Sequence, residues 1–443
     1  MLCLEMSKRA SFFCRNSFLA FLFTLQLLPI EPMLGATPKI FVDSQILLQA
    51  FGWNSMNNGV PSRWYQLLGE RASDIKEFGF STIWLPPISR SVSPQGYMPG
   101  DYYDIGEKGT PTFYGDREQL QDCLKKLHSA RLLVLEDIVI NHRCAGKQDS
   151  NGIWNQYSFP SNKAAWSEWA ICHGEFGGTG HKDTGFGFAP APDIDHFNQT
   201  VQGDIVSWML WLKQLGFDGW RYDFVKGFDP KFVSLFDSRT RPFFSVGELW
   251  TDMSYQGSSL NYDQNAHRQL LCDWLNSAGK TATAFDFTTK GILQAAVNGE
   301  YWRLKDPQGK APGLIGWWPE RSVTFIENHD TGSQQGFWPF PKEKVLQGYA
   351  YILTHPGIPC VFWEHLYDWN LKKDIKDLIE IRRRNGISSK SSLIINKAED
   401  GLYAAIIDEK LAVKLGWKDW NPGPPFSILC SGEQYAVWAR KRQ

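Results

Sequence analysis

Three carboxylates stand in similar sequence surroundings and could share one chemistry. Asp223 follows Arg221 by two residues at the end of a short strand-like segment, so both side chains lie on the same face. The guanidinium should keep Asp223 ionised, which suits a nucleophile better than an acid. A structural ion pair at a strand end is the alternative. Glu248 and Asp330 occupy similar settings, and together they favour the catalytic interpretation.

These carboxylates follow strands in an alternating series of short apolar and helical segments. We expect strands near residues 46, 82, 133, 218, 244, 284, 323 and 359, and helices over 63–78, 117–129, 201–214, 264–277, 289–298, 343–353 and 371–384. Such alternation is typical of βαβ units. The pattern predicts a closed (β/α)8 TIM barrel, whose active site lies at the carboxyl ends of the strands. An open sheet of about six to eight strands is the structural alternative.

Two regions depart from the alternation. Residues 144–192 are rich in Gly, Trp, Ser and Asn, so we expect a long excursion after the third strand, either functional or a small domain. From residue 390 onward, short apolar segments separated by turn residues predict a small antiparallel sheet. The expected organisation is a catalytic barrel over 37–386, which includes the excursion, and a C-terminal β domain over 387–443.

Composition narrows the classes of partner. The chain has 46 basic and 47 acidic residues, so no basic excess suggests nucleic acid. The 20 tryptophans indicate a large core or surfaces that stack on sugar rings. Eight scattered cysteines without a C-x-x-C pair argue against a zinc site or a disulfide scaffold. We expect mostly free thiols, although one bridge remains open.

Residues 1–36 resemble a targeting leader. Lys8, Arg9 and Arg15 precede an apolar run over 18–28, as in secretory signal peptides. The run is too short to be a good membrane span. We expect cleavage near Ala36 and a secreted monomer without a membrane partner. A plastid transit segment or an unprocessed tail is the alternative.

Several blocks at the expected strand ends resemble those of the α-amylase family of glycoside hydrolases. They cover residues 96–99, 137–143, 219–223, 247–250 and 327–330. Further blocks at 261–268, 316–319 and 348–357 are similar to plant-type α-amylases in particular. The resemblance runs from about residue 45 to the C-terminus. One block would be a weak signal, whereas ordered blocks at several strand ends are specific.

The resemblance implies endo-acting hydrolysis of α-1,4-glucosidic bonds in starch and maltooligosaccharides. It assigns Asp223 as nucleophile, Glu248 as general acid/base and Asp330 as the third carboxylate, which stabilises the transition state. Retaining hydrolysis needs a nucleophilic and a protonatable carboxyl group about 5 Å apart. Apolar neighbours and nearby acids should raise the pKa of Glu248. A transglycosidase of the same superfamily and a catalytically inactive starch-binding protein are the alternatives.

The resemblance also implies contacts with the sugar. His142 and His329 would hydrogen-bond sugar hydroxyls, and Tyr97 would stack on a sugar ring. The adjacent Trp317 and Trp318 would bind starch at the surface. Core packing is the alternative for these aromatic and histidine residues. The full set is Tyr97, His142, Arg221, Lys226, Trp250, Trp317, Trp318 and His329.

A structural Ca²⁺ ion is the implied cofactor. Its ligands would be Asn141, Asp183, Asp193 and the backbone carbonyls of Phe186 and Gly227. Oxygen ligands from three separated segments suit a hard cation, which would hold the 144–192 excursion against the barrel. Turn-capping aspartates are the alternative. Further calcium ions are not expected, because Gly187 stands where another acidic ligand would be needed.

Overall fold

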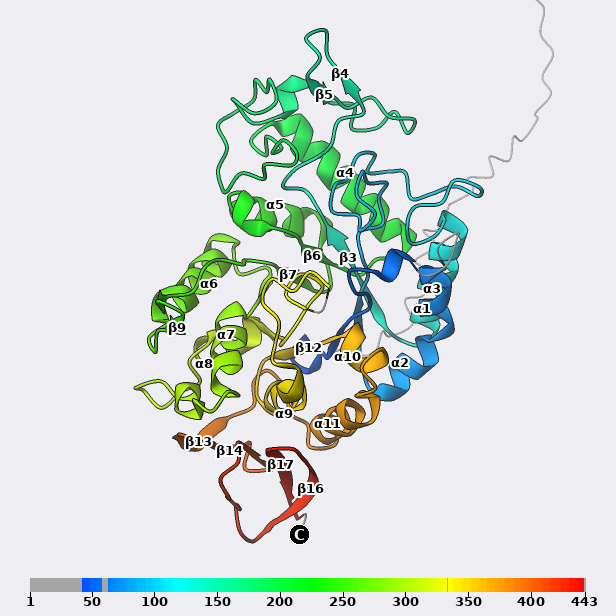
Figure 1. Ribbon diagram of the computed structural model, residues 1–443. Helices are drawn as coiled ribbons and strands as arrows, with labels where there is room; N and C mark the ends of the chain where they lie inside the picture. Colours follow the sequence, from blue (N-terminus) through cyan, green and yellow to red (C-terminus); the bar gives the residue numbers. More distant parts are fainter. Residues whose placement is uncertain (1–41, 58–62, 333, 442–443) are drawn as a thin grey trace, which may run out of the picture. The chain divides into compact units, whose positions relative to one another are not determined.

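Eight parallel strands close into a barrel (Figure 1). The computed structural model describes residues 42–57, 63–332 and 334–441. Strand β1 pairs in parallel with both β2 and β12, which closes the sheet and confirms the barrel rather than the open sheet. The barrel strands are β1 (Leu47–Gln49), β2 (Thr82–Trp84), β3 (Leu133–Ile138), β6 (Gly219–Tyr222), β7 (Ser245–Gly247), β10 (Thr283–Phe285), β11 (Ser322–Thr324) and β12 (Ile358–Phe362).

Burial explains why these short segments form strands. Every barrel-strand residue is buried except Leu133, which is partly exposed. Parallel strands covered on both faces read as nearly continuous apolar runs rather than as an alternating pattern. A charged residue inside such a strand must therefore find its partner within the barrel. Asp137 of β3 and Arg221 of β6 are two such residues, and they lie opposite each other in the strand register.

Helices surround the barrel (Figure 1). The helix expected over 63–78 is divided at Arg71, and α5, α8 and α10 were not expected. The last two are short, which leaves little periodicity in the sequence to detect. The helices are α1 (Trp64–Glu70), α2 (Ala72–Phe78), α3 (Arg117–Ser129), α4 (Gln199–Leu215), α5 (Lys231–Thr240), α6 (Asn265–Ser277), α7 (Phe287–Ala296), α8 (Leu314–Trp317), α9 (Val345–Thr354), α10 (Trp363–Tyr367) and α11 (Lys372–Arg384).

A buried arginine organises the excursion between β3 and α4. Arg143 donates from Nε to the carbonyl of Gly100 and from Nη1 to that of Ala164, both at 2.8 Å. Its guanidinium also lies within 5.2 Å of the ring centroids of four aromatic side chains. The excursion contains only one short hairpin among its described strands, formed by β4 (Lys147–Gln148) and β5 (Trp154–Gln156). Its order therefore depends on side-chain contacts and scattered backbone hydrogen bonds rather than on a long backbone ladder.

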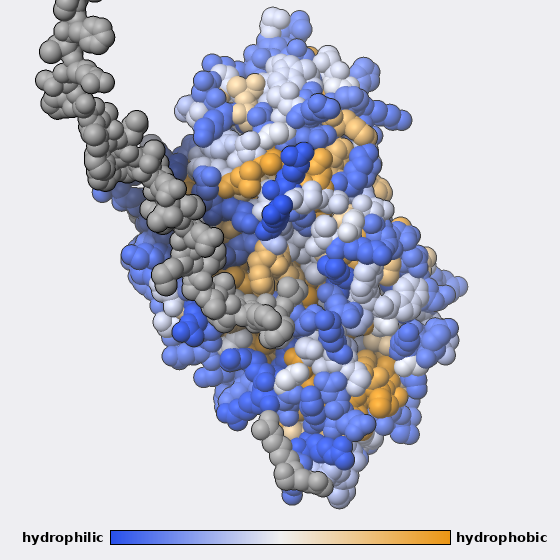
Figure 2. All heavy atoms as spheres, turned by 180° about the vertical axis from the view of Figure 1, so that it is seen from behind, coloured by the Kyte–Doolittle hydropathy of each residue, from blue (hydrophilic) through white to orange (hydrophobic). Residues whose placement is uncertain are grey.

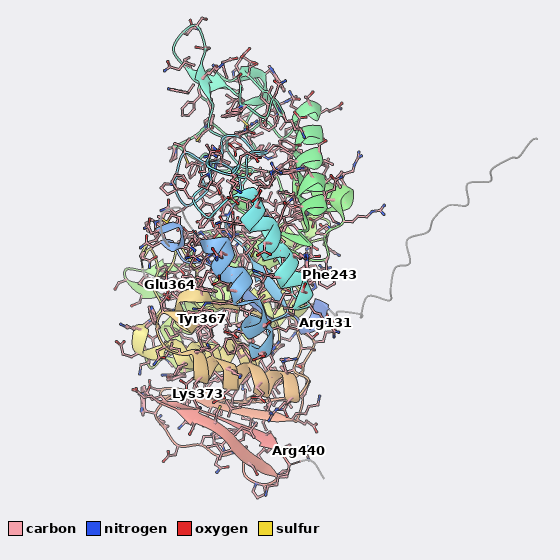
Figure 3. All side chains as sticks on the ribbon, turned by 90° about the vertical axis from the view of Figure 1, so that its right-hand side faces the viewer. Arg131, Phe243, Glu364, Tyr367, Lys373 and Arg440 are labelled. Atoms are coloured by element: carbon pink, nitrogen blue, oxygen red, sulfur yellow. The ribbon has the colours of Figure 1, made fainter. Side chains whose placement is uncertain are left out.

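The C-terminal region forms the expected antiparallel sheet. Its strand order is β13 (Leu393–Glu399), β14 (Leu402–Ile407), β15 (Leu411–Leu415), β17 (Tyr435–Arg440) and β16 (Phe426–Gly432). The sheet contacts α9 and α11, the latter marked by Lys373 in Figure 3. Edge strand β16 is difficult to detect in the sequence because its side chains are largely exposed and show no clear alternation. Proline residues also crowd the preceding segment.

Several further expectations bear on the surface and the thiols. Six cysteines lie within the described residues, and all six are free thiols. None of the helices in the described ranges has the length and apolar character needed to cross a bilayer. On the side opposite to Figure 1, polar residues cover most of the visible surface and apolar residues form separate patches (Figure 2). The proposed leader over 1–36 lies outside the described residues.

The N-terminus of α3 allows a direct test of local stabilisation. Asp116 Oδ1 accepts from the amide of Gln119 at 2.9 Å, and Gln119 Oε1 accepts from the amide of Asp116 at 3.0 Å. Asp116→Ala should lower the free energy of unfolding by about 1 kcal/mol, because it leaves a helix donor without its cap. Denaturant unfolding measures the loss. Glu118→Ala, an exposed change in the same turn, is the control and should cost less.

Candidate active site

A pocket of about 380 Å³ opens at the carboxyl ends of the barrel strands. The structure brings eight of the expected catalytic and sugar-contacting residues to this pocket: Tyr97, His142, Asp223, Lys226, Glu248, Trp250, His329 and Asp330. It adds five lining residues that the sequence did not single out: Trp53, Phe188, Phe224, Gln335 and Phe337. Most of the additions are aromatic, and their arrival here depends on loops that only the folded chain places.

Arg221 lies beneath the pocket and links three carboxylates. Its Nη1 is 2.7 Å from Asp137 Oδ1 and 2.6 Å from Asp223 Oδ1, and its Nη2 is 2.7 Å from Glu248 Oε2. The guanidinium side chain is fully buried. These acids come from β3 and from the ends of β6 and β7, which are neighbours in the barrel. One positive charge therefore faces more negative groups than it can neutralise, and protons must occupy some of them.

Burial decides which acids hold protons. It raises the pKa of Glu248 to about 8, with Arg221 opposing the shift and Asp330, Asp223 and Asp137 adding to it. Burial likewise raises the pKa of Asp137 to about 7, and it also raises the pKa of Asp330. Glu248 is therefore protonated at neutral pH, the state that a general acid requires.

The backbone immediately after Asp223 adopts an unusual conformation. Phe224 has φ 46° and ψ 44°, the left-handed region, which costs a non-glycine residue about 1–2 kcal/mol. This conformation turns the chain directly after the strand and carries Phe224 to the pocket lining. The Phe224 amide also lies 3.4 Å from Glu248 Oε2, to which it donates a hydrogen bond. The turn thus couples the segments that carry Asp223 and Glu248.

An aromatic wall forms one side of the pocket. The rings of Trp53, Tyr97 and His329 are within 9° of parallel, with centroids 4.9–6.3 Å apart. The Tyr97 ring is fixed in position because its hydroxyl donates to Asp137 Oδ2 at 2.7 Å. Trp84 Nε1 donates to the same oxygen at 3.0 Å. The wall is therefore rigid, and such a flat apolar surface suits the C–H face of a sugar ring.

The two histidines differ in how their ring nitrogens are engaged. Gln49 Nε2 donates to His329 Nδ1 at 3.0 Å, which places the His329 proton on Nε2, 3.2 Å from Asp330 Oδ2. His142 Nε2 donates to the carbonyl of Tyr97 at 2.9 Å, and its Nδ1 lies 3.4 Å from Asn141 Nδ2. Burial lowers the pKa of both rings, so both are neutral at pH 7. Both nitrogens of His142 thus already have protein partners.

The remaining expected sugar contacts divide into two groups. Lys226 lies 5.0 Å from the Phe224 ring centroid, and Trp250 stacks on Phe287 at 5.5 Å; both line the pocket. Trp317 and Trp318 do not line it. Trp317 is 39% exposed, and the Arg268 guanidinium lies 3.4 Å from the centroid of its ring. One face of Trp317 is therefore covered by the protein itself.

A second cluster of acids lies where the excursion meets the barrel. Glu175, Asp183 and Asp193 each offer one oxygen, and the three atoms lie within 4.8 Å of one another. Asn141 Oδ1 and Asp193 Oδ2 are buried and have no hydrogen-bond partner among the described residues. Burial, followed by Glu175 and Asp183, raises the pKa of Asp193 to about 8. Unpaired buried oxygens beside crowded acids fit a hard cation such as Ca²⁺.

The backbone contributes to the same cluster. A Cβ atom on Gly227 would lie 1.9 Å from Asn141 Oδ1, so only glycine permits this approach. The Phe186 amide donates to the carbonyl of Lys226 at 3.0 Å, which ties the excursion to the segment after β6. Glu175 was missed in the sequence because no motif marks it. Its Oε2 accepts from the Asp193 amide at 2.8 Å, a contact across 18 residues of irregular chain.

Comparisons with known proteins agree with this arrangement. A family model described as "Alpha amylase, catalytic domain" matches residues 66–249, and one described as "Alpha-amylase C-terminal beta-sheet domain" matches 384–439. "Probable alpha-amylase 2" of Arabidopsis thaliana is 44% identical over 398 residues, covering 89% of this chain and 94% of that protein. "Alpha-amylase 3, chloroplastic" of the same plant is 45% identical over 89% of this chain but only 44% of its own length.

The solved structures that resemble this chain share its fold at low identity. An alpha-amylase from Geobacillus thermoleovorans complexed with acarbose superposes with a TM-score of 0.63 and 16% identity, over 91% of this chain and 99% of that one. Identity at this level supports the fold and does not transfer the function of single residues.

The acidic cluster predicts a response to calcium. Ca²⁺ at about 100 times its Kd should stabilise the fold by about 2.7 kcal/mol, because binding to the native state alone shifts unfolding by mass action. Asp193→Asn and Glu175→Gln should each abolish most of the rise in melting temperature. Asp419→Asn, at an exposed position in the C-terminal region, is the matched control and should respond like the wild type. Equal melting temperatures with calcium and with chelator would contradict the assignment.

Proposed function

The chain belongs to the α-amylase family of glycoside hydrolases, and on that basis we propose how its residues hydrolyse starch and maltooligosaccharides. The reaction is an endo-acting cleavage of internal α-1,4-glucosidic bonds that retains the anomeric configuration. The observation that carries the proposal is the arrangement around Arg221, where one guanidinium contacts both Asp223 and Glu248 at the floor of the pocket. The two groups of a retaining glycosidase require such proximity.

Asp223 acts as the nucleophile. Its contact of 2.6 Å with Arg221 Nη1 favours the negative charge that attack requires. In the first step its carboxylate bonds to the anomeric carbon while the bond to the glycosidic oxygen breaks. Glu248 gives its proton to that departing oxygen, and its raised pKa suits this role. In the second step Glu248 removes a proton from the attacking water, which releases the sugar from Asp223.

Asp330 orients the sugar and stabilises the positive charge of the transition state. Gln335 Nε2 donates to Asp330 Oδ1 at 3.0 Å, and His329 Nε2 lies near the other oxygen. The Tyr97 ring supports the sugar bound next to the cleavage point, and Lys226 and Trp250 contact the leaving-group side. His142 and His329 hydrogen-bond sugar hydroxyls. In the free protein, His142 Nε2 donates to the Tyr97 carbonyl at 2.9 Å.

A calcium ion, when bound, supplies positive charge that holds the excursion against the barrel. Asn141, Asp183, Asp193 and Glu175 would hold it, together with the carbonyls of Phe186 and Gly227. Asn141 directly precedes His142, so this site adjoins the pocket wall. The pair Trp317 and Trp318 is proposed as a surface contact for starch, with Trp317 offering the face that Arg268 leaves open.

We propose that the chain has three parts. Residues 1–36 form a targeting leader, 37–386 the catalytic barrel and 387–443 the C-terminal β domain. Secretion remains the proposed destination, and a plastid is the alternative because one relative is named chloroplastic. Sequencing the N-terminus of the protein from its native source distinguishes a processed leader from an intact Met1.

A product analysis tests the function as a whole. Purified protein should release reducing sugars from soluble starch, and the oligosaccharides should carry the α configuration when first formed, as seen by NMR. Maltoheptaose separates hydrolysis from transfer, because a transglycosidase would also produce longer chains. Release of β-configured products, or of none, would overturn the proposal.

The raised pKa of Glu248 predicts an alkaline limit to activity. The free enzyme needs this proton, so kcat/KM on maltoheptaose should fall tenfold per pH unit above about pH 8. The loss follows from deprotonation, since the neutral form is the active one. α-Glucosyl fluoride needs little protonation of its leaving group and should show a weaker alkaline fall in the first step. An equal fall with both substrates would assign the limit to another group.

Glu248→Gln should separate binding from proton transfer. The amide is nearly isosteric and can still form hydrogen bonds, but it has no proton to give, so activity on maltoheptaose should fall by about 10²–10⁴. With α-glucosyl fluoride the variant should form the covalent intermediate on Asp223 and then stall. Azide needs no general base and should release it, which mass spectrometry of the intact protein can follow.

Asp223→Asn is the matched comparison for this experiment. It removes the nucleophile and should form no covalent intermediate with either substrate, with or without azide. If Glu248→Gln is equally impaired with glucosyl fluoride and with maltoheptaose, Glu248 is not the acid.

A further inference from the structure

One wall of the pocket is an irregular segment, residues 335–338. Gln335 and Phe337 line the pocket, and Gln335 Nε2 donates to Asp330 Oδ1 at 3.0 Å. The segment also folds back on the backbone that carries Asp330. The amide of Phe337 donates to the Asp330 carbonyl, and that of Trp338 to the Thr331 carbonyl, both at 3.3 Å. Any displacement of the segment would therefore be passed to the third carboxylate.

Two side chains of α7 hold this segment from outside the pocket. Lys290 Nζ donates to the Trp338 carbonyl at 2.7 Å, and Gln294 Nε2 donates to the Pro339 carbonyl at 2.9 Å. The two side chains also bond to each other, because Lys290 Nζ donates to Gln294 Oε1 at 2.6 Å. Lys290 Nζ lies 4.1 Å from the centroid of the Trp338 ring as well. The carbonyls of two successive residues are thus fixed by one helix.

The helix surface is shaped for this contact. A Cβ atom on Gly291 would lie 2.7 Å from Trp338 Cη2 and 2.2 Å from Met253 Sδ. Glycine at position 291 therefore lets the Trp338 ring lie directly on α7. The Lys290 amine is fully buried, which lowers its pKa to about 7, and burying a polar group is costly unless it is hydrogen-bonded. A neutral apolar residue would avoid this cost, so we attribute the lysine at this position to its hydrogen bond with the Trp338 carbonyl.

The chain just beyond this segment is held by an acid. Glu327 Oε1 accepts from the Phe340 amide at 2.6 Å, and Glu327 Oε2 lies 2.7 Å from His365 Nε2. His365 Nδ1 is in turn 2.7 Å from the Tyr349 hydroxyl. The Lys290 amine and the Glu327 carboxyl group therefore fix the backbone on either side of Pro339. Neither Lys290 nor Glu327 lines the pocket.

We propose that Lys290 and Gln294 are positioning residues for the hydrolysis, which hold Gln335 against Asp330 and Phe337 at the pocket mouth by fixing the Trp338 and Pro339 carbonyls. This inference rests on the proposed function, because it gives Asp330 its role in the transition state. Positioning of this kind matters because a displacement of about 1 Å can cost about 10²-fold in rate.

Lys290→Met tests the proposal, because methionine keeps most of the side-chain length and removes the donor. On maltoheptaose, kcat should fall by about 10- to 100-fold while KM changes less, since Asp330 acts in the transition state. The matched control is Lys213→Met. Lys213 Nζ donates to the carbonyls of Thr240 and Arg241 at 2.8 Å, which is the same kind of contact on α4, away from the pocket. Its kcat should stay within about twofold of wild type.

A double-mutant cycle with Gln335→Ala tests the route of the effect. If Lys290 acts through Gln335, the loss in kcat caused by Lys290→Met should shrink at least several-fold when Gln335 is already alanine. Fully additive losses would overturn the proposed route. Gln294→Met, at a partly exposed position, replaces Lys290→Met if the latter does not fold, with the same cycle and the same criteria.

The outcomes separate the two proposals. A wild-type protein that releases no sugar from soluble starch refutes the proposed function. An active wild type whose Lys290→Met variant retains the kcat of Lys213→Met refutes the positioning role alone. A fall in kcat restricted to Lys290→Met, at a melting temperature matched by the control, supports it.

Discussion

A single buried guanidinium sets the conditions for the rest of the site. Arg221 has no access to water, so the oxygens of Asp137, Asp223 and Glu248 take the place of water around its guanidinium. Burial, together with repulsion from the neighbouring acids, raises the pKa of Asp137 and of Glu248. Arg221 thus pairs with Asp223, while burial and the neighbouring acids leave Glu248 with a proton in spite of the nearby positive charge.

The barrel provides the geometry that this balance needs. Asp137, Arg221 and Val246 are paired across β3, β6 and β7, so the acids that follow these strands emerge at one edge. The same strand end also reaches the acidic cluster, since Asn141 and His142 lie in the segment just after β3. Asn141 faces Asp193 and His142 touches the Tyr97 carbonyl. A cation there would therefore act on the pocket wall through two adjacent residues.

The loops that finish the pocket have little regular structure, and buried charges hold them instead. Arg143 fixes the excursion through two carbonyls and four rings, while Lys290 and Glu327 fix the segment that carries Gln335 and Phe337. Buried arginine, lysine and glutamate each cost desolvation energy, which their hydrogen bonds must offset. Their benefit is precise placement of backbone that has no ladder or helix to position it.

The local pattern of the sequence was enough to predict the barrel, the C-terminal sheet and the carboxylates at the strand ends. Strand burial and helix periodicity are properties of neighbouring residues, so the eight strands and α3 could be predicted closely. Three contacts could not be predicted in this way. They are the contact of Glu175 with Asp193, the ion pair of Arg221 with Asp137, and the hydrogen bond from Lys290 to the Trp338 carbonyl. Each joins segments far apart in the chain, from 18 residues for Glu175 to 84 for Asp137 and Arg221. Such contacts leave no local periodicity, and only closure of the barrel and the packing of its loops decided them.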